Sequence, residues 1–121
     1  MKIGTPKEIF EGENRVAMTP DSALQLQKLG HTCVIETGAG AAAGFDDAAY
    51  EGAGVEVVNT AAALYKAADV VAKVRPPSDA EVKRLRAGQT LISMFNPAGN
   101  KELMEAAAAK GATVMAMDMV P

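Results

Sequence analysis

Short apolar stretches alternate along this chain with longer segments in which apolar residues recur at helical spacing. The short stretches are typical of β-strands. They cover residues 2–5, 32–36, 55–58, 69–74, 90–94 and 113–117. Residues 69–74 are nearly all apolar, as in a parallel strand that is covered on both faces.

A helix is predicted between each pair of successive strands. The five segments are 21–29, 46–51, 61–67, 79–86 and 101–110, with Thr19, Thr60, Ser78 and Asn100 as candidate N-caps. Strand–helix alternation with short connections predicts right-handed βαβ units. The expected fold is therefore a three-layer α/β domain of Rossmann or flavodoxin type, with a mostly parallel open sheet flanked by helices.

Composition narrows the class of protein. The 121 residues suit one domain, 1–121, and Cys33 is the single cysteine, so no disulfide forms within the chain. The net charge of −3 and the lack of tryptophan argue against nucleic acid as a partner. One cysteine and one histidine do not make a zinc site, and we expect no metal. No leader peptide or membrane-spanning segment is expected.

The glycine-rich segment 38–44 follows a strand, as a dinucleotide-binding loop would. However, Ala43 stands where the fingerprint places its third glycine, and the next helix is predicted to begin too late to meet a pyrophosphate. We expect a domain without its own dinucleotide fingerprint and assign no nucleotide to this loop.

Three polar residues are predicted at the carboxyl edge of the sheet, where open α/β folds bind ligands. Arg15 lies on the loop after the first strand, Lys73 near the end of 69–74, and Asn96 after 90–94. Arg15 and Lys73 together could bind a carboxylate or phosphate. The alternative is that they form structural ion pairs, for example with Glu8 or Glu13, and that Asn96 belongs to a simple turn.

No residue is assigned a catalytic role. His31, at the opposite edge, is expected to be exposed, which leaves no histidine as a general base and no Ser–His or Cys–His pair. Arg75, next to two prolines, is expected to be solvated.

Several motifs, taken together, resemble one family. They are KIGTPKE (2–8), ENRVA (13–17), Thr19–Pro20, ETGAG (36–40), DVVAKV (69–74) and VMAMDMVP (114–121). This set resembles the amino-terminal domain shared by alanine dehydrogenase and the alpha subunit of proton-translocating NAD(P) transhydrogenase. The tail MAMDMVP (115–121) and Phe45–Asp47 look like the transhydrogenase branch.

The resemblance implies a larger assembly. A Rossmann domain that binds NAD(H) would follow Pro121 in the same subunit, and an NADP(H)-binding component and a membrane-spanning component would lie elsewhere. A homodimer at the cytoplasmic side of the bacterial inner membrane is implied. Hydride would pass from NADH to NADP+ while protons cross the membrane.

The resemblance also assigns roles to single positions. In alanine dehydrogenases an arginine and a lysine that match Arg15 and Lys73 hold the substrate carboxylate, and a histidine acts as acid and base at the position of Asn96. An asparagine does not shuttle protons, whereas hydride transfer between two nicotinamides needs positioning and no base. Asn96 therefore favours the transhydrogenase branch.

Two other functions remain open at this stage. One is the amino-terminal substrate domain of an alanine-dehydrogenase-like enzyme. The other is a stand-alone domain that binds a small anion or a partner protein. In either enzyme the isolated chain is expected to fold, but to be inactive and to bind no cofactor tightly.

Overall fold

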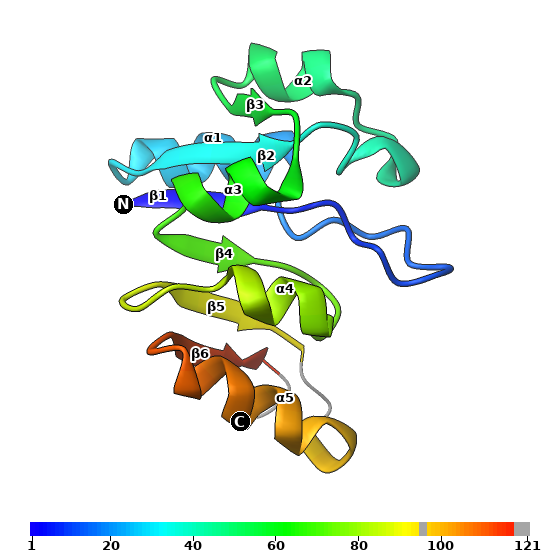
Figure 1. Cartoon of the computed structure of the whole chain (residues 1–121). Coiled ribbons are helices and arrows are strands. Elements are labelled where there is room, and N and C mark those ends of the chain that lie inside the picture. Colours follow the sequence, from blue (N-terminus) through cyan, green and yellow to red (C-terminus); the bar gives the residue numbers. More distant parts are fainter. Residues whose placement is uncertain (95–96, 118–121) are drawn as a thin grey trace.

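The computed structural model describes residues 1–94 and 97–117 as six parallel strands with helices on both sides (Figure 1). The strands are β1 (Lys2–Thr5), β2 (Thr32–Glu36), β3 (Glu56–Val58), β4 (Val70–Ala72), β5 (Thr90–Ser93) and β6 (Thr113–Ala116). Their order in the sheet is β3-β2-β1-β4-β5-β6, and each pair of neighbours is parallel. The predicted fold class is confirmed.

The helices begin close to the predicted caps. They are α1 (Pro20–Lys28), α2 (Asp47–Gly52), α3 (Ala61–Ala67), α4 (Asp79–Arg84) and α5 (Pro97–Ala109), with a 3₁₀ turn, η1, at Ala41–Ala43. Thr19, Thr60 and Ser78 each accept a hydrogen bond from the backbone N–H three residues on. Asn100, at φ −132° and ψ 29°, lies where two helical segments meet within α5, so one of them begins after it as predicted for 101–110. The difference from the prediction is the earlier helical segment that begins at Pro97.

The two faces of the sheet carry separate hydrophobic cores. Helices α3, α4 and α5 cover one face, with Leu64, Tyr65, Leu85 and Ala107 in the core beneath them. Helices α1 and α2 lie on the other face, over a second core that includes Ala23, Tyr50 and Ala53. No helix in the described part of the chain is long and apolar enough to span a bilayer.

Strand β4 is shorter than predicted, and the reason lies beside it. Pro6 follows β1 and has no N–H to donate, and the side chain of Glu8 accepts hydrogen bonds from the backbone N–H groups of Val74 and Arg75. These amides bond to a carboxylate and not to the backbone of a neighbouring strand. Lys73 therefore lies just beyond the end of β4, at the carboxyl edge of the sheet.

The strand order fixes where a ligand would meet the fold. From β1 the chain proceeds outward to β2 and β3, and from β4 it proceeds in the opposite direction to β5 and β6. The loops after β1 and β4 therefore diverge to opposite faces of the sheet, which opens a crevice between them. Such a switch point is where open α/β sheets bind their ligands.

Candidate functional site

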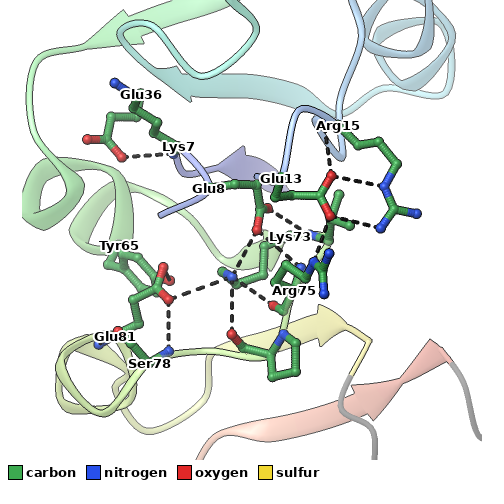
Figure 2. Close-up of polar contacts among 12 residues, drawn as sticks. Lys7, Glu8, Glu13, Arg15, Glu36, Tyr65, Lys73, Arg75, Ser78 and Glu81 are labelled. Carbon is green, nitrogen blue, oxygen red and sulfur yellow. Dashed lines mark hydrogen bonds and ion pairs between the residues drawn. The ribbon is translucent and has the colours of Figure 1, made fainter. Parts of the chain in front are cut away.

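Two loops meet at the switch point: residues 6–19, between β1 and α1, and residues 73–78, between β4 and α4. Figure 2 shows two carboxylates of the first loop, Glu8 and Glu13, pointing toward the basic residues of the second. Both carboxylates therefore join the two loops.

Lys73 lies at the centre of this contact and is enclosed, with only 1% of its side chain exposed. Its ammonium group lies 3.2 Å from Glu8 Oε1 and 3.6 Å from Glu81 Oε1. It also donates to the carbonyl oxygen of Arg75, at 2.7 Å. A buried ammonium between two buried carboxylates is a stable arrangement only while each partner is present.

Helix α4 brings the second carboxylate to this cluster. Glu81 is the third residue of α4, and it closes a capping box by accepting a hydrogen bond from the backbone N–H of Ser78, at 2.9 Å. Its other oxygen accepts a hydrogen bond from the hydroxyl of Tyr65, at 3.1 Å. Burial, followed by the nearby negative charge of Glu81, raises the pKa of Tyr65, so this hydroxyl stays protonated.

Glu13 forms a second ionic group at the mouth of the crevice. Its carboxylate accepts hydrogen bonds from the Arg15 side chain, at 2.9 Å and 2.8 Å, and from Arg75 Nε, at 2.7 Å. Hydrogen bonds from the side chain and backbone of Arg15, and then from Arg75, lower the pKa of Glu13 well below its ordinary value. The Arg75 guanidinium also stacks on Phe10, 4.2 Å from the ring centre.

The structure places the predicted residues as follows. Arg15 and Lys73 both lie at the carboxyl edge, but each is paired with a carboxylate, as in the ion-pair alternative. The two face different hollows: Lys73 lines one of about 520 Å³ and Arg15 one of about 250 Å³. Anion binding by this pair stays a prediction, and Asn96 lies outside the described residues.

Arg75 is the residue that the sequence argument missed. It was expected to be solvated, yet it bonds to Glu13 and lines the larger hollow with Phe10 and Pro77. Arg15 is the more exposed partner, with 68% of its side chain accessible. The alternation of side chains along a strand could have indicated this position for Arg75. Lys73 and Arg75 are two residues apart after β4, so an extended chain points both side chains to the same side. His31 is half-buried, whereas it was expected to be exposed.

The glycine-rich segment 38–44 does not fit a dinucleotide-binding loop. Residues 38–44 form a turn and η1, and α2 begins at Asp47, capped by Asp46. A Cβ at position 40 would collide with the ring of Tyr50, so packing accounts for Gly40. Asp47 accepts hydrogen bonds from Thr37 and the backbone of Gly38, which further closes the loop. No phosphate cradle results, and we derive no cofactor contact from this segment.

Comparison with known proteins identifies the family. Residues 4–121 match the model of the alanine dehydrogenase/PNT N-terminal domain. The chain belongs to this family. It is 73% identical, over all 121 residues, to the NAD(P) transhydrogenase subunit alpha of Cereibacter sphaeroides.

Solved structures of this family agree in fold. A transhydrogenase from Sinorhizobium meliloti superposes with a TM-score of 0.94 at 39% identity, over the whole chain and 36% of the solved one. An L-alanine dehydrogenase superposes with a TM-score of 0.90 at 40% identity, over 96% of the chain and 32% of the solved one. The chain spans 23% of the length of the Cereibacter subunit. Identity near 40% is found with relatives of both branches, whereas the identity of 73% is to a transhydrogenase subunit.

Proposed function

We propose that this domain is part of the NAD(H)-binding component of an NAD(P) transhydrogenase, which transfers hydride from NADH to NADP+ coupled to proton movement across a membrane. The observation that carries the proposal is the 73% identity to a transhydrogenase alpha subunit. This identity extends over all 121 residues of the chain. The fold and the matched family model are common to both branches and support membership only.

The residue types at the positions matched to the alanine dehydrogenases support this choice. Asn96 cannot relay a proton, which oxidation of an amino acid requires and direct hydride transfer does not. Lys73, the expected carboxylate ligand, is already bonded to Glu8 and Arg75. A substrate carboxylate would have to displace Glu8 or Glu81 to reach its ammonium group.

The domain would form one side of the cofactor-binding cleft and would provide the surface against which the cofactor-binding domain docks. Since residues 38–44 form a closed turn in place of a pyrophosphate loop, NAD(H) would be held mainly by a Rossmann domain of the same subunit. The NADP(H)-binding and membrane-spanning components would be further partners. A homodimer at the cytoplasmic side of the bacterial inner membrane completes the proposal.

The test uses the complete enzyme in membrane vesicles. We expect NADH-dependent reduction of an NADP+ analogue whose reduced form absorbs at a distinct wavelength, with a rate that changes when a proton gradient is imposed. Pyruvate and ammonium should leave the rate of NADH oxidation unchanged. Hydride transfer that is absent from vesicles containing all subunits would contradict the proposal.

An alanine-dehydrogenase-like enzyme is the second candidate, favoured by the close superposition on an L-alanine dehydrogenase. Its signature would be NADH oxidation that depends on both pyruvate and ammonium. If the complete protein showed neither reaction, the domain would be better described as a module that binds a small anion or a partner.

A further inference from the structure

Basic side chains gather at the edge of the sheet opposite the crevice. Each helix of a parallel sheet returns the chain to the amino edge, and the ends of α3, α4 and α5 lie next to one another there, on the left of Figure 1. Exposed lysines and arginines occupy the last turns of these helices and the residues that closely follow them. This basic amino-edge patch consists of Lys66, Lys83, Arg84, Arg86 and Lys110.

Hydrogen bonds join the three helix ends into one surface. Arg86 Nη2 donates to the carbonyl oxygen of Lys66, at 3.2 Å, and to that of Ala68, at 2.8 Å. Lys110 Nζ donates to the carbonyl oxygen of Lys83, at 3.2 Å. The basic residues of α3, α4 and α5 are therefore neighbours in space, and their charges act together on whatever approaches this edge.

The patch carries more positive charge than the helices require. Its side chains form no ion pair with any carboxylate in the part of the chain that the structure describes. A helix dipole favours cations near its C-terminus, but three helix ends together offset at most about 1.5 of the five positive charges. Asp69, which begins the return into β4, accepts a hydrogen bond from the backbone N–H of Lys2, at 2.8 Å. An excess of positive charge is left for a partner.

The surroundings of the patch disfavour a membrane as that partner. Peripheral attachment to a bilayer combines charge with apolar side chains that enter the lipid. The exposed residues between the cations are small, as Ala87, Gly88 and Ala108 are. Among the described residues, the large exposed apolar side chains belong to other segments of the chain.

Nucleic acid is disfavoured as well. Proteins that bind single strands present aromatic rings on which bases stack, and the aromatic residue nearest to the patch in sequence, Tyr65, is only 1% exposed. The whole chain has a net charge of −3, which repels a long polyanion beyond the patch itself.

We propose that the basic amino-edge patch binds a short acidic segment of a separate protein. Aspartate and glutamate carboxylates complement the patch in sign, and an arginine such as Arg84 binds a carboxylate through two parallel hydrogen bonds. Packed helices lie about 8–10 Å apart, so three helix ends span about 20 Å. An extended acidic segment of about six residues matches this length.

The position of the patch sets the character of the complex. Exposed charge pairs contribute little each and are screened by salt, so the complex should form rapidly, dissociate rapidly and weaken as the salt concentration rises. Because the patch lies at the amino edge, a bound partner leaves the crevice at the carboxyl edge open. The proposal does not depend on the proposed hydride transfer.

The test uses the complete protein and a fluorescently labelled peptide of ten glutamates, with fluorescence anisotropy as the readout. We expect binding at low salt that weakens steeply as NaCl is added. Lys83→Glu should weaken binding by about tenfold, because it replaces an attraction by a repulsion. The matched control is Lys101→Glu, the same change of charge on a mostly exposed residue of α5 far from the helix end, and should change binding by less than about twofold.

Three outcomes would overturn the proposal. One is the absence of peptide binding by the parent protein at low salt, and another is equal weakening by Lys83→Glu and Lys101→Glu, which would reduce the effect to net charge. The third is tighter binding of another polyanion, either vesicles that contain phosphatidylglycerol or single-stranded polyuridylate, than of the glutamate peptide. No readout requires turnover, so failure here and failure of the proposed function are distinguishable.

Discussion

At the scale of single residues, the crevice is organised by carboxylates that hold basic side chains. The sequence identified Arg15 and Lys73 as residues of the carboxyl edge and named Glu8 and Glu13 as possible partners. It did not determine which pairs form, because the Glu8–Lys73 pair joins side chains that are 65 positions apart. Arg75 was missed for the same reason: its partner, Glu13, belongs to the other loop.

Replacing Lys73 should destabilise the domain strongly. Lys73→Met leaves Glu8 and Glu81 buried without their cation, and we expect the free energy of unfolding to fall by about 3–5 kcal/mol. Lys101→Met is the matched control, since Lys101 pairs with Glu105 on the surface, where both side chains are mostly exposed, and should change stability by less than about 0.5 kcal/mol. Urea unfolding of the domain measures both. Equal effects of the two substitutions would contradict the enclosed cluster.

Glu13 should make the free energy of unfolding depend on pH in the acidic range. Its pKa is lower in the folded domain than the ordinary 4.5 of the unfolded chain, so its contribution is complete above that value and declines as the pH falls further. Glu13→Gln should flatten the loss of stability below pH 4.5, whereas the control Glu11→Gln, on an exposed residue of the same loop, should not. Thermal unfolding at a series of pH values provides the comparison. Parallel curves for Glu13→Gln and the parent would exclude this role.

At the scale of elements, the sequence predicted all six strands and the five α-helices, and the differences lie at their ends. The caps at Thr19, Thr60 and Ser78 were predictable because capping is local, between a side chain and an amide three residues on. The early end of β4 was not predictable, because the competing acceptor, Glu8, comes from another loop. The helical segment that precedes Asn100, from Pro97, was not predicted, whereas the helix after Asn100 was.

Gly4 should be intolerant of a side chain. A Cβ at this position would lie 2.8 Å from Cβ of Ala68 and 3.0 Å from Leu64, so β1 and α3 would have to separate. We expect Gly4→Ala to cost about 1–3 kcal/mol in stability. Gly52→Ala is the control, since nothing lies within 4 Å and alanine favours a helix by about 0.5–1 kcal/mol. A neutral Gly4→Ala variant in the same unfolding assay would show that the two elements are not in close contact.

At the scale of the whole molecule, the family membership sets what a change at position 96 should do. Asn96→His introduces the acid–base group of the alanine dehydrogenase branch into a protein that we propose to be a transhydrogenase. We expect the complete enzyme to remain without pyruvate-dependent NADH oxidation, because one proton relay does not create a substrate site. The assay is NADH absorbance with and without pyruvate and ammonium. A pyruvate-dependent rate well above that of the parent would favour the second branch.

The seam between the two halves of the sheet has a consequence for movement. Strands β1 and β4 are joined by the pairs Ile3–Val70 and Gly4–Val71, and Glu8 bridges the same seam through Lys73, Val74 and Arg75. The hydrogen bonds of the sheet and the ionic contacts of the loops thus hold β1 and β4 together along the same boundary. Without them, this boundary would be the natural hinge of the domain. We expect the crevice to stay rigid. Any closure around a ligand would then take place by motion of other parts of the enzyme toward this domain.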